Sequence, residues 1–209
     1  NIDLGIVEDA KFDLKLDKIV QAITVNNGKN TTEHVYNSKL AKIDFESKYA
    51  KTSSMVVEYK FTITNEGGIA GYVKKLADYL PEELKFNSEL NKDWYEGKDG
   101  IIYNASLANT IINPGESKEV TLILTWINRE DNMGLKVTVA EISKDYNEYG
   151  SPDIDSTPNN KVPGEDDIDD APVMLTVTTG EKVMYLGIYI AVLAVIAVGI
   201  YGLKKYIIK

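Results

Sequence analysis

The chain has 209 residues and no cysteine, which excludes a disulfide framework and a cysteine metal site. Its formal charge is −9, and leaving out the three lysines of residues 204–209 makes it −12. A surface this acidic repels nucleic acid and suits cation binding, so no nucleic-acid partner is expected. The sequence starts without a signal peptide, so we expect it to be the C-terminal part of a longer exported precursor.

Alternating apolar and polar residues predict short strands along the chain. The alternating segments are 11–25, 55–64, 120–127, 135–142 and 172–178. The residues expected to face the core are Phe12, Leu14, Leu16 and Val20; Val57, Tyr59, Phe61 and Ile63; Val120, Leu122, Leu124 and Trp126; Leu135, Val137 and Val139; and Val173, Leu175 and Val177. Residues 71–80 are expected to form strand and loop rather than helix.

Turn sequences separate the predicted strands. They fall at 65–68, 96–100, 113–117 and 128–134. Short strands without interleaved helices favour an all-β chain folded as an antiparallel β-sandwich. We place its core at 55–143, and expect residues 1–54 to supply one or more N-terminal strands and a connector.

Residues 144–172 form an acidic, proline-containing stretch that cannot bury a core. We interpret it as a long loop between two edge strands of one domain, and a solvated stalk is the alternative. Residues 173–182 are then the last strand and a juxtamembrane segment.

This acidic stretch begins like a calcium-binding loop. Asp145, Asn147, Gly150 and Asp153 stand at the first, third, sixth and ninth positions of an EF-hand pattern. The pattern then fails, because Tyr149 takes the fifth position and Ser156 replaces the bidentate glutamate. With Asp155 beside them, the oxygen-bearing residues Asp145, Asn147, Asp153 and Asp155 remain a candidate calcium site. A solvated loop without an ion is the favoured interpretation.

Residues 183–203 are apolar, Gly or Tyr, without a charge. A helix of this length spans about 31 Å, which matches a bilayer hydrocarbon core of about 30 Å. The lysines of 204–209 predict a cytoplasmic tail, since positive residues stay inside. The sequence therefore predicts a single-pass protein of the cell membrane, with its N-terminal part extracellular and the lipid bilayer as a partner of the C-terminal helix.

Part of the sequence resembles the conserved-repeat Ig-like domain of large Gram-positive surface proteins. The stretches that carry the resemblance are "VVEYKFTITNEGGIAGYVKKLADYLPEELKF", "INPGESKEVTLILTW" and, further on, "DIDSTP". The resemblance covers roughly residues 55–175. The matching positions are Asn65, Gly67, Asp78, Leu80, Pro81, Pro114 and Gly115. It implies an Ig-like sandwich that serves as a structural stalk or adhesin module, with upstream domains in the same chain and an extracellular ligand as partners.

The sequence departs from this family in its last strand and before the apolar segment. The family's last core strand often reads Asn-Thr-Ala-Glu, where this chain has Thr-Val-Ala-Glu at 138–141. Surface proteins of this type often carry a Leu-Pro-x-Thr-Gly sorting signal, where this chain has Thr-Val-Thr-Thr-Gly at 176–180. A wall protein attached by a sortase through a degenerate signal therefore remains an alternative, as does the anchor domain of a surface enzyme.

Residues for catalysis are scarce. His34 is the one histidine, and no G-x-S-x-G nucleophile motif occurs. We therefore expect a non-catalytic protein without a bound cofactor other than calcium.

Lys18 falls on the apolar side of the first strand. Related surface domains condense such a lysine with an Asn or Asp into an internal isopeptide bond, and Asp78 stands where a carboxylate is usual. Thr138 takes the place of the expected asparagine. We therefore expect no isopeptide, and a lysine at an edge strand whose ammonium reaches solvent.

Overall fold

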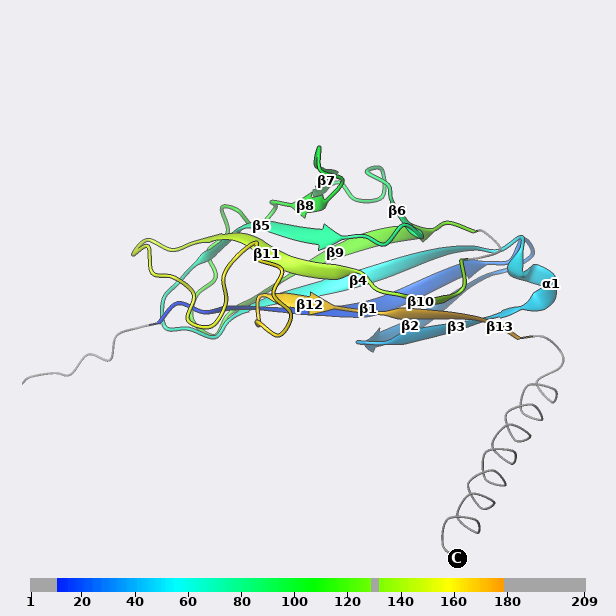
Figure 1. Cartoon of the computed structure of the whole chain (residues 1–209), viewed down its shortest axis with the longest axis horizontal. Coiled ribbons are helices and arrows are strands. Elements are labelled where there is room, and N and C mark those ends of the chain that lie inside the picture. The colour runs from blue at the N-terminus through cyan, green and yellow to red at the C-terminus, as the bar shows by residue number, and fades with distance from the viewer. Residues whose placement is uncertain (1–10, 129–131, 179–209) are drawn as a thin grey trace, which may run out of the picture.

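A computed structural model describes residues 11–128 and 132–178. Within them the chain is all-β apart from one short helix (Figure 1). The elements are β1 (Leu14–Asn26), β2 (Thr31–Ser38), β3 (Ala41–Glu46), α1 (Ser47–Ala50), β4 (Ser54–Asn65), β5 (Tyr72–Tyr79), β6 (Leu84–Phe86), β7 (Trp94–Glu96), β8 (Ile102–Asn104), β9 (Ser117–Trp126), β10 (Gly134–Lys136), β11 (Val139–Tyr146), β12 (Ile168–Asp170) and β13 (Val173–Thr178).

The strands form two five-stranded sheets and one three-stranded sheet. Their orders are β2-β1-β4-β9-β6, β12-β11-β5-β8-β7 and β10-β13-β3. The pair β11–β12 continues as the pair β10–β13 in the same antiparallel register, since Val139 pairs with Asp170 and Lys136 with Val173. The three-stranded sheet therefore extends the second five-stranded sheet along the molecule.

The apolar side of β4 forms the centre of the core. Its residues Val57, Tyr59, Phe61 and Ile63 are completely buried, as the alternation predicted. They lie in one cluster with apolar residues of β1, β5, β9 and β11, so the two large sheets pack face to face. At the far end Phe45 of β3 stacks on Trp126 of β9, with ring centroids 5.1 Å apart. The predicted all-β fold with antiparallel sheets is confirmed, and it is consistent with a β-sandwich.

The predicted phase of residues 135–142 is wrong. Leu135 is 52% exposed, whereas Lys136, Thr138 and Ala140 are buried. The run is two strands, because pairing is interrupted at residues 137–138 between β10 and β11. The inward residues are therefore the even-numbered ones, which include two polar side chains that a search for alternating apolar residues passes over.

Three further expectations need correction. Val177 of β13 is exposed, although Val173 and Leu175 are buried as predicted. β13 pairs in parallel with β3, so the architecture is not purely antiparallel. The strands on either side of the acidic loop are also interior rather than edge strands: β11 lies between β12 and β5, and β13 lies between β10 and β3.

The predicted membrane span at 183–203 lies outside the described residues. Within residues 11–128 and 132–178, no helix has the length and apolar character needed to cross a membrane.

Candidate metal centre

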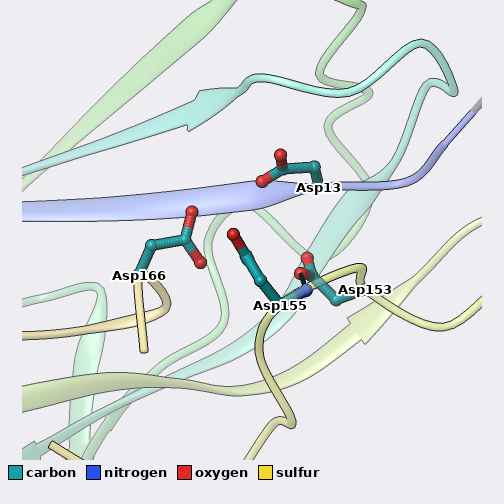
Figure 2. A group of neighbouring side chains, drawn as sticks. All are labelled: Asp13, Asp153, Asp155 and Asp166. Atoms are coloured by element: carbon teal, nitrogen blue, oxygen red, sulfur yellow. Dashed lines mark hydrogen bonds between the residues drawn. The ribbon is translucent and has the colours of Figure 1, made fainter. Parts of the chain in front are cut away.

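Four aspartates converge at the end of the molecule where β1 begins. Asp13 precedes β1, Asp153 and Asp155 lie in the loop after β11, and Asp166 lies just before β12. One carboxylate oxygen from each lies within 4.8 Å of those of the other three. Figure 2 shows the four side chains pointing toward one another, with Asp155 between Asp166 and Asp153. Segments about 140 residues apart in sequence thus supply one compact group of oxygens.

Backbone hydrogen bonds hold the loop against the start of β1. The amide of Leu14 donates to Asp153 Oδ2 at 2.8 Å, and the amide of Ile154 donates to the carbonyl of Phe12 at 3.1 Å. Further along, the amide of Leu16 donates to the carbonyl of Asp166 at 2.8 Å. These bonds hold the backbone segments that carry the four carboxylates next to one another. The short aspartate side chains are therefore brought together by the backbone.

The loop also organises itself through its own polar side chains. The Asn147 amide closes a turn, donating to the Ser151 carbonyl at 2.7 Å and accepting from the Ser151 amide at 3.0 Å. The Glu165 carboxylate accepts from the Thr157 amide at 2.9 Å and from Asn160 Nδ2 at 2.7 Å. Hydrogen bonds therefore order the acidic loop near both of its ends, although its composition predicts a solvated segment.

Burial and electrostatic repulsion together disfavour the charged form of two of these carboxylates. Burial, followed by the charges of Asp153 and Asp155, raises the pKa of Asp13. Burial and the charge of Asp155 raise the pKa of Asp166 to about 7. A carboxylate whose largest influences are burial and other carboxylates is costly to ionise unless a proton or a cation joins it.

Among the residues that the structure describes, some of these oxygens have no hydrogen-bond partner. Asp13 is buried at 8% exposure, and its Oδ1 finds no partner within 11–128 and 132–178. The same holds in this part of the chain for Oδ1 of Asp166, which is also buried. Buried carboxylate oxygens without donors are rare in stable proteins, because each keeps the cost of desolvation without compensation.

The donor set fits a hard divalent cation. Calcium takes oxygen ligands at roughly 2.3–2.6 Å, so oxygens on opposite sides of one ion are about 5 Å apart. The four carboxylates have that spread, and calcium completes its shell with backbone oxygens or water. The arrangement can therefore bind a cation and, through it, join β1 to the loop.

The sequence-predicted calcium residues divide into two groups. Asp153 and Asp155 belong to the cluster. Asn147 lies outside it with its side chain engaged in the turn, and Asp145 lies outside it, half-buried at the end of β11. The EF-hand pattern missed Asp13 and Asp166, because they are far from the loop pattern in sequence. The run of three acidic residues at 165–167 is the sequence feature that could have pointed to Asp166.

A second polar group lies inside the core. Lys18 is completely buried, which corrects the prediction that its ammonium reaches solvent. Its Nζ lies 2.5 Å from Asp78 Oδ2 and 2.5 Å from Thr138 Oγ1, and above the rings of Tyr59 and Phe61. At Lys18, β1 pairs with Phe61 of β4, and on its other side the Lys18 amide donates to Asp169 of β12. The lysine is interior because its inner face is covered by the opposite sheet, which carries Asp78.

Comparison with known proteins gives only a distant likeness. No family model and no curated protein matches the chain. The crystal structure of the CARDB domain of a Pyrococcus furiosus protein, in complex with di-metal ions, is similar at 13% identity and a TM-score of 0.34, covering 82% of this chain and all of that domain. A solution structure of that domain matches at 11% identity and the same TM-score, covering 78% and 96%. At this TM-score the likeness is remote, and the candidate metal centre described above rests on this chain's own residues.

Proposed function

We propose that this chain is a non-catalytic structural module of an extracellular protein, stabilised by calcium and tethered to the cell membrane by residues 183–203. It acts as a stalk that holds upstream domains of the same protein, and the ligand they present, away from the cell. The observation that carries the proposal is the cluster of Asp13, Asp153, Asp155 and Asp166, four carboxylates within 4.8 Å of one another.

Calcium is the ion proposed for the cluster. All four side chains offer hard oxygen ligands, which suit calcium and magnesium rather than softer metals. Magnesium keeps several waters and usually takes only one or two carboxylates, whereas calcium accepts many protein oxygens in flexible geometry. Calcium is also the ion that extracellular modules bind at millimolar to submillimolar concentrations.

The positions of the two ends support a spacer role. In Figure 1 the described chain starts before β1 at one end of the long axis, and β13 finishes at the other end. A module built this way adds its full length between whatever precedes β1 and whatever follows β13. The calcium cluster lies at the β1 end, where the chain would be pulled if the module were under tension.

Calcium-dependent thermal unfolding tests the proposal. The 209-residue chain in non-ionic detergent should melt at a higher temperature in millimolar calcium than in chelator, because an ion that binds only the folded state stabilises it by mass action. At a concentration 100-fold above the dissociation constant this amounts to about 2.7 kcal/mol. Asp153→Ala with Asp155→Ala should abolish the rise.

Two controls make this test specific. Asp155→Asn alone should remove most of the calcium effect, since Asp155 is exposed and its loss leaves the Leu14–Asp153 hydrogen bond in place. Asp93→Ala with Glu96→Ala removes two exposed acids at β7, the opposite edge of the sheet from β12, and should leave the rise unchanged. Identical melting curves of the parent chain in calcium and in chelator would refute the calcium role.

A further inference from the structure

Three loops form an open pocket at the end of the protein where β1 begins. They are the β4–β5 connection, the loop before β9 and the loop after β11. The volume of the pocket is about 430 Å³, which falls within the roughly 300–1,000 Å³ of small-ligand sites. In chain order, its lining includes Ile69 and Tyr72, Ile111, and Glu148, Tyr149 and Ser151.

Buried contacts hold two of these loops together. The Asn65 side chain is completely buried, and its Nδ2 donates to the carbonyls of Ile69 and Ile112 at 2.8 Å each. Gly71 and Ile112 exchange backbone hydrogen bonds at 3.1 and 2.8 Å. A Cβ at Gly71 would lie 2.2 Å from the Phe12 ring, so this segment packs directly on the chain that enters β1. These walls are fixed by the fold itself, which reduces the ordering cost of binding a ligand.

The third wall is a turn that presents an exposed aromatic ring. The Tyr149 amide donates to Asn147 Oδ1 at 3.1 Å, while the Tyr149 side chain is 78% exposed. Ile111, which also lines the pocket, is 43% exposed. Large apolar side chains gathered around one pocket indicate an interaction site, whereas scattered ones do not.

The charge of the pocket favours a cation. Glu148 is the only charged residue among the described residues that line it, and the chain as a whole carries a formal charge of −9. Tyrosine rings attract cations too, and Lys74 does this beside the pocket, with its Nζ 4.5 Å from the ring centroid of Tyr72. The Lys74 ammonium also donates to the Ala108 carbonyl at 2.5 Å. It lies outside the lining and leaves Glu148 and Tyr149 to a ligand.

We infer that this pocket binds a lysine or arginine side chain exposed on a partner protein. The aliphatic stem of that side chain packs against Ile69, Ile111 and the ring of Tyr149, and its cationic head pairs with the Glu148 carboxylate. The apolar walls suit such a stem better than a hydrated metal ion, and the carboxylate disfavours an acidic peptide. The inference goes beyond the proposed stalk function, because it gives the module a contact surface of its own, and it does not depend on calcium.

Binding of short peptides tests this. The probe is acetyl-Gly-Ala-Lys-Ala-Gly-amide, and a matched peptide carries norleucine, which keeps the aliphatic stem without the ammonium. Added to the isotope-labelled 209-residue chain in non-ionic detergent, the lysine peptide should shift the amide resonances of residues 68–72 and 148–151 in nuclear magnetic resonance spectra. The norleucine peptide should bind at least severalfold more weakly.

Variants separate the two parts of the pocket. Glu148→Gln should reduce the affinity for the lysine peptide to that for the norleucine peptide, and Tyr149→Ala should weaken both. Both residues are exposed, so the variants should fold like the parent. The matched controls are Glu96→Gln and Tyr95→Ala, an exposed acid and an exposed tyrosine of β7, and they should change neither affinity.

The lysine peptide should bind at least as tightly in millimolar calcium as in chelator. A lysine peptide that calcium displaces would place the ammonium in the aspartate cluster and overturn the inference. Equal binding of the lysine and norleucine peptides, or shifts confined to other residues, would also overturn it. None of these results bears on the calcium-dependent melting curves, so the failure of one proposal is distinguishable from the failure of the other.

Discussion

Lys18 Nζ on β1 lies 2.5 Å from Asp78 Oδ2 on β5, and both side chains are completely buried between the two large sheets. Burial lowers the pKa of Lys18 and raises that of Asp78, while the charge of each partner opposes the shift. The pair connects the two layers at a place where either group alone would be an uncompensated charge in the core.

Removing one member of this pair should be severely destabilising. Lys18→Met leaves the Asp78 carboxylate buried without a cation and should lower the free energy of unfolding by about 3–5 kcal/mol. Replacing both, as Lys18→Met with Asp78→Leu, should recover much of that loss, because two apolar side chains need no partner. Urea unfolding measures both variants.

A surface lysine of the same strand provides the control. Lys15 pairs with Glu66 at 2.9 Å, and both side chains are nearly half exposed. Lys15→Met should therefore cost less than about 1 kcal/mol. A similar loss for Lys18→Met and Lys15→Met would contradict the importance of the buried pair.

The pair should remain non-covalent. The two side-chain oxygens hydrogen-bonded to the Lys18 ammonium belong to Asp78 and Thr138, and a threonine hydroxyl carries no acyl group that an amine could attack. The intact mass of the purified chain should therefore equal that of its sequence. A deficit of about 18 Da, the water lost if Lys18 condensed with Asp78, would overturn this prediction.

Stability without calcium should fall as pH rises from about 4 to 7. The pKa values of Asp166 and Asp167 are raised from 3.8 to about 7 in the folded protein. The folded state therefore binds more protons than the unfolded state in this window, and raising the pH favours unfolding. Melting in chelator at a series of pH values measures the slope, and saturating calcium should reduce it.

Substituting one of these acids gives the control for the pH effect. Asp166→Asn should flatten the pH dependence in chelator, while the exposed Asp93→Asn should leave it unchanged. A melting temperature that rises between pH 4 and pH 7 in chelator would contradict this prediction. It would show that groups other than Asp166 and Asp167 determine how stability depends on pH in this range.

Gly67 packs directly against the backbone that leads into β1. A Cβ at this position would lie 2.5 Å from the Lys11 carbonyl oxygen and 2.7 Å from the Asp13 amide nitrogen, both of them backbone atoms. Gly67→Ala should therefore displace the chain around Asp13, lower the melting temperature in chelator, and weaken calcium binding severalfold. Calorimetric titration checks the affinity, and an unchanged dissociation constant would show that Asp13 is not a ligand.

The apolar segment 183–203 should keep the mature protein in the membrane. The chain lacks Leu and Pro of a sorting signal before Gly180, and the segment is long enough to span the bilayer. Detergent should release the chain from membranes with the C-terminal "KKYIIK" still detectable. Release only by wall-digesting enzymes, with a mature chain ending at Thr179, would identify a sorting signal instead.

The sequence alone determined the strands with simple alternation. β4 was predicted with its buried face because every second residue is apolar and a strand has a period of two. The same rule failed at 135–142, where the inward positions include Lys136 of β10 and Thr138 between β10 and β11. Composition also indicated the acidic loop, since charge and proline content are local properties.

Only the tertiary structure decided which acids meet and which lysine is enclosed. Asp13 joins Asp153 and Asp166 because loop and strand exchange backbone hydrogen bonds, a relation that no spacing along the chain encodes. From the sequence, Lys18 could have been an edge lysine with a solvated ammonium. In the fold its strand pairs with β4 and Asp78 faces it from the other sheet. The free energy of burying these charges depends on contacts between segments that are distant in sequence. The sequence could therefore indicate which residues matter, but not which partners they meet in the fold.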